Sequence, residues 1–296
     1  MITMSCRTRI DTGVFGLDIL LGSGFWSNSV NVVLGSTGTG KTVFALQFVM
    51  RGLENGEKCV FVSFDMSKKD IIDVAESFGW DISKYIDSGE LAIDKFFAED
   101  VSYINNDLLS FITSESKDFD RVRIVIDSFT PLISSLEYEM RNDVNWFFTR
   151  LKELGTSVIT LEEPLDGNMS RPSVEIPMFL GDTVIHLKNI GYGEAFNRTL
   201  RIIKHRSSWH AEGVFPYRIM KGIGIFIEGT AIVKEMKRKI NLSEILKDMR
   251  ISPETIPAEA MEKLSAFSSE CVQCSDDIVK EVVKAVIECY SKYQKF

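Results

Sequence analysis

The feature that most constrains this 296-residue chain is a glycine-rich run between an apolar segment and a helical one. Residues 30–34 predict a buried strand and residues 41–52 predict a helix, so the run forms a strand-to-helix turn. Its glycines let backbone N–H groups curl around an anion, which the positive end of the helix dipole also attracts. The pattern is that of a Walker A phosphate loop, formed here by Gly35, Ser36, Thr37, Gly38, Thr39, Gly40, Lys41 and Thr42.

This loop predicts a binding site for ATP with Mg²⁺. Lys41 is expected to neutralise the β- and γ-phosphate oxygens, and the Thr42 hydroxyl is placed to ligate Mg²⁺. Val43, the next residue of the helix, is included among the nucleotide-contacting residues. The alternative is a glycine-rich turn without a ligand, against which the eight matching positions in a strand–loop–helix context argue.

The remaining segments predict an α/β fold. Short apolar runs alternate with helical patterns, which implies βαβ units and a mainly parallel central sheet. Glycines 52, 79 and 155 stand where helices are expected to end. After residue 187, closely spaced strands joined by glycine turns predict antiparallel strands at the C-terminal end of the sheet. The predicted strands are 30–34, 58–64, 91–94, 123–126, 157–161, 183–187, 199–204, 214–220 and 223–227, and the helices 41–52, 69–78, 105–114 and 142–154.

A change of pattern near residue 230 predicts two parts, an ATPase domain at 1–230 and a helical C-terminal extension at 231–296. The extension opens with a basic cluster at 234–239, more simply a solvated helix face than a nucleic-acid contact. Residues 276–290 carry apolar positions at three- and four-residue steps, as in an amphipathic helix. Cys271 and Cys274 form a single pair without further zinc ligands, so we interpret them as ordinary thiols.

Composition excludes some classes of protein. A net charge of −8 and a pI near 5.1 argue against a general attraction to nucleic acid. No apolar run approaches the roughly 20 residues that cross a bilayer, and the N-terminus lacks the apolar region of a secretory signal. Five scattered cysteines fit reduced thiols. We therefore expect a soluble, cytoplasmic protein that does not bind membranes.

Three carboxylates end predicted strands on the side of the sheet where ligands bind. Asp127 follows an apolar strand and matches a Walker B residue that holds the Mg²⁺ shell, although a strand-ending aspartate can also cap a loop. Asp65 ends the second strand and is a candidate for polarising the attacking water; alternatively, it is the N-cap of the next helix. Glu162 is a candidate γ-phosphate sensor or a residue that solvates the loop at Pro164.

Several separate motifs resemble one family. Residues 15–25 are similar to the "GLDxLLGGGxP" lead-in of the KaiC-like branch of the RecA superfamily, with Walker A at the expected distance. Residues 45–48, 70–72 and 78–81 resemble later segments of that family, and residues 198–210 resemble its "LxIxKxRxxxH" strand. The resemblance runs from about Arg9 to Glu228.

The resemblance implies a RecA-like P-loop core that assembles side by side, often as a hexameric ring, with ATP between protomers. Lys204 and Arg206 would then reach the γ-phosphate of a neighbour's ATP in trans and stabilise the charge of phosphoryl transfer. His210 would lie near the same nucleotide. Without the resemblance, Lys204 and Arg206 would be interpreted as a solvated strand face.

One departure from the family concerns catalysis. The family has two adjacent acidic residues after its second strand, whereas this chain has Asp65 followed by Met66. Because a displaced carboxylate can cost about a hundredfold in rate, slow hydrolysis or a binding-only ATP switch is one hypothesis. The others are an oligomeric ATPase that regulates a protein partner, and a single-stranded-DNA-binding regulator of recombination like the archaeal RadA paralogs.

Overall fold

The structure is a computed structural model that describes residues 8–97, 107–134, 140–191, 198–228 and 246–258, and eight further positions between 260 and 287. A nine-stranded sheet has the order β11-β10-β9-β8-β3-β7-β6-β4-β5. Its strands are β3 (Val30–Gly35), β4 (Lys58–Ser63), β5 (Leu91–Lys95), β6 (Val122–Asp127), β7 (Thr156–Glu162), β8 (Thr183–Asn189), β9 (Arg198–His205), β10 (Phe215–Met220) and β11 (Gly224–Ile227). A separate two-stranded sheet pairs β1 (Arg9–Ile10) with β2 (Phe25–Trp26) in antiparallel register.

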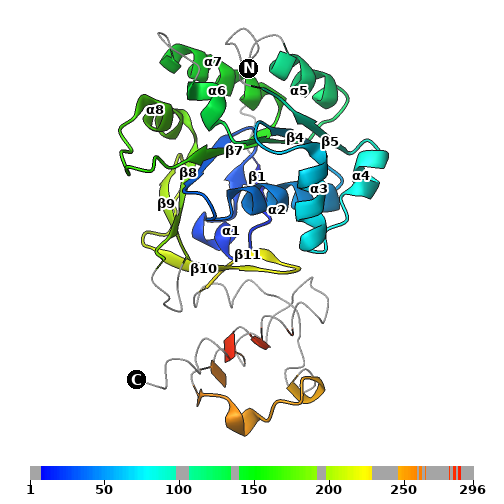
Figure 1. The fold of residues 1–296 in the computed structure, drawn as a ribbon, viewed down its shortest axis with the longest axis vertical. Helices are drawn as coiled ribbons and strands as arrows, with labels where there is room; N and C mark the ends of the chain where they lie inside the picture. Colours follow the sequence, from blue (N-terminus) through cyan, green and yellow to red (C-terminus); the bar gives the residue numbers. More distant parts are fainter. Residues whose placement is uncertain are drawn as a thin grey trace, which may run out of the picture.

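The strands from β8 to β5 are parallel, and β3, β4 and β6 are buried at every residue, as expected for strands that helices cover on each side. Alternate residues enter two apolar clusters: Val32 and Leu34 face one, and Val33 faces the other. Helices α5 (Leu109–Ser116), α6 (Thr130–Ser134), α7 (Met140–Leu154) and α8 (Pro172–Leu180) contribute to the first face. The other face carries α1 (Leu17–Leu20), α2 (Lys41–Glu54), α3 (Lys68–Ser77) and α4 (Ser83–Asp87) (Figure 1).

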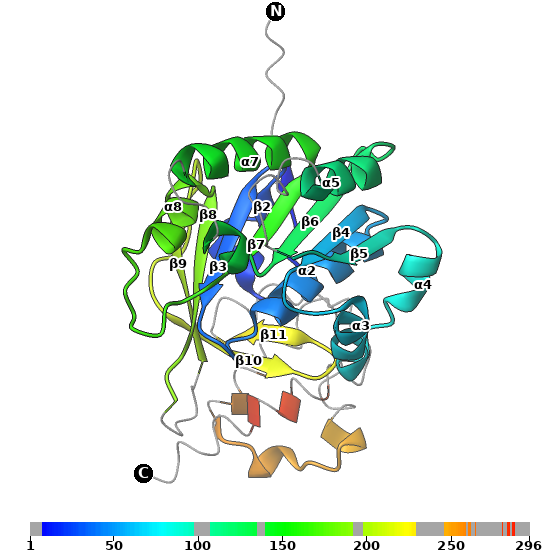
Figure 2. The ribbon, with the colours of Figure 1, turned by 45° about the horizontal axis from the view of Figure 1, so that its top comes forward.

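Beyond β8 the direction reverses, so β9, β10 and β11 are each antiparallel to their neighbours. The β10–β11 hairpin lies on the α2 side of the molecule, away from α5 and α7 (Figure 2). Gln47 of α2 fastens it: its side-chain amide donates to the carbonyls of Ile223 and Ile225 and accepts from the Ile225 N–H. The predicted RecA-like α/β core with antiparallel strands at its C-terminal end is confirmed.

The structure corrects some predicted element boundaries. Helix α2 does not end at Gly52 but continues to Glu54, and its C-cap is Asn55. Gly52 is a glycine because of packing, and it does not cap the helix. A Cβ at Gly52 would lie 2.5 Å from Cδ of the buried Arg123 side chain. Gly79, with a φ of 80°, follows the end of α3 as predicted. Helix α8 was not predicted, because its prolines at positions 172 and 177 are typical of a loop.

The division at residue 230 remains a prediction. The described residues of the predicted extension include a short 3₁₀ helix at Pro253–Thr255 and buried apolar side chains that share a cluster with α2, namely Leu246, Ile256, Ala260, Leu264 and Val283. The basic cluster at 234–239, Cys271, Cys274 and most of the predicted helix at 276–290 lie outside the described residues. Among the described helices, none has the length and apolar character needed to span a bilayer.

Candidate nucleotide site

The phosphate loop lies between β3 and α2, as the sequence predicts. Gly38 and Gly40 both have positive φ, 80° and 96°, so the backbone can turn back on itself before α2 begins at Lys41. A Cβ on Gly40 would lie 2.6 Å from Cδ1 of Ile219 on β10. The conformation and the close approach of β10 together require glycine at this position.

Lys41 lies across the loop that it follows. Its Nζ donates to the carbonyls of Gly35 at 2.9 Å and Ser36 at 3.1 Å, and only 7% of its side chain is exposed. The same Nζ forms an ion pair with Oε1 of Glu162 at 2.8 Å, and Oε2 of Glu162 accepts from the Thr37 hydroxyl at 3.5 Å. The structure therefore brings Glu162 onto the phosphate loop, rather than leaving it to solvate the loop at Pro164.

Asp127, at the carboxyl end of β6, meets Thr42 in the first turn of α2. The Thr42 hydroxyl donates to Oδ2 of Asp127 at 2.8 Å, and the Thr160 hydroxyl donates to Oδ1 at 2.5 Å. Burial raises the pKa of Asp127, the two hydroxyls partly offset this by lowering it, and the nearby negative charge of Asp65 raises it further. The peptide bond from Asp127 to Ser128 is cis.

These oxygens fit a magnesium ion. A carboxylate and a hydroxyl side by side are hard oxygen donors, and Mg²⁺ in nucleotide sites is held by few protein ligands besides phosphates and waters. Among the described residues there is no cluster of three or more His, Cys, Asp or Glu side chains suited to a metal. Thr42 and Asp127 are therefore the residues that would hold the ion.

Asp65 lies in an exposed bend just after β4, whose end is paired with the end of β6 at Asp127. The bend is fixed by the Met66 N–H, which donates to Oγ of Ser63 at 2.9 Å, and by Nζ of Lys95, which donates to the Asp65 carbonyl at 3.1 Å. The alternative role of Asp65 as an N-cap is wrong. Ser67 caps α3 and forms a capping box with Asp70.

Lys204 and Arg206 lie at the amino ends of the parallel strands, whereas the phosphate loop of their own chain lies at the carboxyl ends. Because β9 is antiparallel to β8, His205 pairs with Thr183 at the start of β8, while the phosphate loop follows the carboxyl end of β3. Seven residues of β8 correspond to about 20 Å at the usual rise of a strand. These two cations therefore do not reach the phosphate loop of the same chain.

The two cations contact the carboxyl end of α8. Nζ of Lys204 donates to the carbonyls of Met178 at 2.6 Å and Phe179 at 2.9 Å, and Arg206 donates to Phe179 at 2.6 Å. Burial, with the nearby Arg206 charge, lowers the pKa of Lys204 to about 8. His210 is partly buried, and its Nδ1 lies 3.2 Å from the Ala211 carbonyl.

Sequence reasoning missed two contacts of this site. The Thr160 hydroxyl donates to the second oxygen of Asp127, and its signal was a hydroxyl between the apolar residues Ile159 and Leu161 of a buried strand. Tyr217 of β10 donates from its hydroxyl to the Thr39 carbonyl at 2.5 Å, and burial raises the pKa of that phenol. No local pattern marks Tyr217, because the contact depends on the fold of the hairpin.

Comparisons with known proteins agree with this geometry. A family model described as "ATPase: KaiC" matches residues 10–231. The circadian clock oscillator protein KaiC of Prochlorococcus marinus subsp. pastoris is 32% identical over 253 residues, covering 81% of this chain and 49% of that protein. KaiC of Acaryochloris marina is 33% identical over 231 residues, covering 74% of this chain and 44% of that protein. The chain thus spans about half the length of these curated relatives.

Among solved structures, a KaiC-like protein of the hyperthermophilic archaeon Pyrococcus horikoshii OT3 is similar, with a TM-score of 0.64 and 31% identity. The match covers 75% of this chain and all of that one. The family match spans most of the sheet and every element of the candidate site. The chain therefore belongs to the KaiC-like family of the RecA superfamily and is an ATP-binding P-loop ATPase of that family.

Proposed function

We propose that this protein is a Mg²⁺-dependent ATPase that binds ATP at residues 35–43. The observation that carries the proposal is the pairing of Thr42 with Asp127, 2.8 Å apart, directly beside the phosphate loop. When bound, Mg²⁺ would neutralise charge on the β- and γ-phosphate oxygens. Thr160 and Thr42 hold the Asp127 carboxylate in one orientation, and Lys41 is already beside the loop carbonyls.

Asp65 is the proposed water-polarising residue. It lies at the end of β4 next to the Asp127 strand, and its exposed carboxylate is free to face solvent on the ligand side of the sheet. Glu162 is the proposed γ-phosphate sensor, because it contacts both Lys41 and Thr37. The thioether of Met66 cannot act as a base, so a single carboxylate performs this step and turnover is expected to be slow.

We further propose that the complete active site forms between protomers. Lys204 and Arg206 lie at the opposite end of the strands from their own phosphate loop. The γ-phosphate that they would contact must therefore belong to the ATP of a neighbouring copy. His210 lies on the same segment. This arrangement supports a side-by-side homo-oligomer, of which a hexameric ring is one form, acting as a nucleotide-driven regulator of another protein.

A complementation experiment tests this proposal. Lys41→Ala is expected to abolish ATP binding, whereas Arg206→Ala is expected to bind ATP normally and release little phosphate. Mixed in equal amounts, the two inactive variants should recover about a quarter of wild-type turnover, because randomly formed interfaces pair an intact loop with an intact Arg206 at that frequency. No recovery in mixtures shown to exchange subunits would refute the action of Arg206 in trans.

The same assay separates the alternatives. Phosphate release stimulated by single-stranded DNA would support a RadA-paralog-like regulator of recombination, which the net charge of −8 does not favour. ATP binding without measurable phosphate release would leave a binding-only switch. Measuring the mass in solution with and without ATP tests oligomerisation directly.

A further inference from the structure

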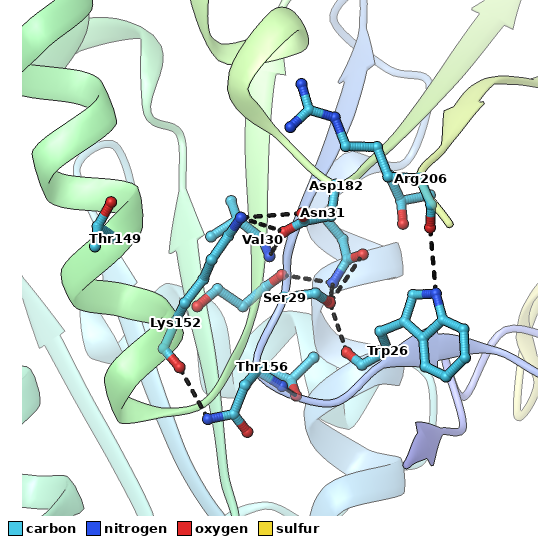
Figure 3. A network of polar contacts seen from close by, with 12 residues as sticks. Trp26, Ser29, Val30, Asn31, Thr149, Lys152, Thr156, Asp182 and Arg206 are labelled. Atoms are coloured by element: carbon cyan, nitrogen blue, oxygen red, sulfur yellow. Dashed lines mark hydrogen bonds and ion pairs between the residues drawn. The ribbon is translucent and has the colours of Figure 1, made fainter. Parts of the chain in front are cut away.

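The segment at 205–211, which carries Arg206 and His210, is held by the N-terminal part of the chain. Trp26, at the end of β2, donates from Nε1 to the Arg206 carbonyl at 3.2 Å (Figure 3). The Ala211 N–H donates to the Leu20 carbonyl at 2.7 Å. Residues nearly 200 positions apart in the sequence are thus joined through the backbone of this segment.

Arg9, on β1, contacts residues that precede and follow Arg206 in the sequence. Its guanidinium lies 3.6 Å from the centre of the Trp26 ring and donates to the Gly24 carbonyl at 2.8 Å. The same group reaches Nε2 of His205 at 2.8 Å and donates to the hydroxyl of Ser208. Arg9 and Trp26, which we call the N-terminal clamp, therefore contact His205, Arg206 and Ser208.

His205 is in the neutral form that this contact requires. Since Arg9 can only donate, Nε2 of His205 accepts, and Nδ1 then carries the proton that it donates to Oγ1 of Thr183, 2.9 Å away. Burial and the charge of Arg9 lower the pKa of His205 to about 4. The imidazole therefore remains an acceptor for Arg9 at neutral pH.

The other side of the segment is fixed as well. The Arg206 N–H donates to the Asp182 carbonyl at 2.8 Å, and the Asp182 carboxylate accepts from the Val30 N–H at 2.9 Å and from Lys152 at 2.8 Å. Figure 3 shows this network beside Arg206. Ser207 adopts a φ of 58°, so the chain turns sharply just after Arg206. Both backbone groups of Arg206 are thereby held, while its side chain extends to the Phe179 carbonyl.

We propose that Arg9 and Trp26 are positioning residues for Arg206 in phosphoryl transfer. The inference rests on the proposed function, because it assigns them to the residue that would contact the neighbour's ATP. The clamp acts on the backbone from which the Arg206 side chain extends, and small displacements of a charged group from the transferring phosphoryl are costly. Trp26 precedes the start of β3, whereas the phosphate loop follows the end of β3, so we expect the clamp to leave the loop of its own chain intact.

Two conservative variants test the clamp. Trp26→Phe removes the Nε1 donor but keeps a ring under Arg9, and Arg9→Met keeps an aliphatic side chain over the ring. Each is expected to lower kcat about five- to tenfold, about the net contribution of a single hydrogen bond, because Arg206 is displaced and not removed, with an unchanged KM for ATP. Trp80→Phe is the matched control, because Trp80 stacks on Phe78 outside the clamp and should leave kcat unchanged.

Two further measurements separate positioning from a general structural role. Amide hydrogen exchange at 205–211 is expected to accelerate in both clamp variants and not in Trp80→Phe. In an Arg206→Ala background, Trp26→Phe is expected to cause no further loss of turnover, because it acts through the side chain already removed.

Each outcome has a distinct meaning. Unchanged exchange in both clamp variants would overturn the clamp, whatever the turnover. Faster exchange with full turnover, in a protein that loses turnover on Arg206→Ala, would overturn the positioning role while leaving the proposed function intact. Full turnover in Arg206→Ala itself would overturn the proposed role of Arg206 and the inference with it.

Discussion

The hydroxyl of Thr160 is expected to stabilise the buried charge of Asp127, and Thr160→Val removes that hydroxyl at nearly constant volume. Both side chains are buried, and the Asp127 carboxylate accepts from only two side-chain hydroxyls in the described structure, those of Thr160 and Thr42. A hydrogen bond to a charged group contributes about 1.5–3 kcal/mol. The variant should lose about that much free energy of unfolding at a pH above the pKa of Asp127, where its carboxylate is charged.

The loss should depend on pH in a defined direction. Without the Thr160 hydrogen bond the already raised pKa of Asp127 rises further, so the folded variant takes up a proton at a higher pH than the wild type does. Its deficit in the free energy of unfolding therefore shrinks as the pH falls through the raised pKa of Asp127. Urea denaturation at several pH values measures this, and Thr160→Ser is the matched control that keeps the hydroxyl.

The same change has a consequence for activity, because a protonated Asp127 is a poor ligand for Mg²⁺. The acid limb of the ATPase pH profile should move to higher pH in Thr160→Val and remain in place in Thr160→Ser. A loss of stability that does not change with pH, or an equal defect in both variants, would show that Thr160 acts by packing alone.

Three other changes have expected outcomes. Burial raises the pKa of Asp18 to about 6, so stability that is present at low pH is lost as the pH rises from about 4 through 6. In urea denaturation, the free energy of unfolding of Asp18→Asn should therefore gain about 2 kcal/mol relative to wild type between pH 4 and pH 8. Because Lys204 has a pKa of about 8, phosphate release should fall as pH rises through 8, and Lys204→Arg should remove this alkaline limb of the pH profile. An unchanged limb in Lys204→Arg would refute the role of Lys204 in phosphoryl transfer. Gly52→Ala should lower the free energy of unfolding by about 1–3 kcal/mol despite a better helix propensity, since its Cβ would meet Arg123, and a neutral result by thermal melting would contradict that clash.

Local patterns were sufficient to predict the sheet and the phosphate loop. The loop at 35–42 is a contiguous motif whose chemistry depends on neighbours in the sequence, and buried parallel strands are visible as short apolar runs. Asp127 could be predicted for the same reason, because it directly ends such a run.

Other features depend on contacts that no local pattern contains. The choice of Ser67 over Asp65 as the cap of α3 depends on which residue adopts extended backbone and receives the Asp70 N–H. The position of Lys204 depends on the direction of β9. The carbonyls that it contacts belong to α8, a helix whose two prolines made the sequence pattern resemble a loop. Gly52 resembles a helix terminator until Arg123, 71 positions later, is seen to fill the space beside it.

The reversal of the chain at β9 gives this protein two different faces at the two ends of its parallel strands. The carboxyl ends of the parallel strands present a phosphate loop, and the amino ends present Lys204 and Arg206. Copies that join in the proposed way, phosphate loop against Lys204 and Arg206, form a directional series. Each added copy completes one active site and leaves an incomplete one at the end of the series. An open series always has one complete site fewer than it has subunits, and only closure into a ring makes the two numbers equal. Turnover per subunit should therefore increase with assembly and level off at closure, whatever the number of copies in the ring.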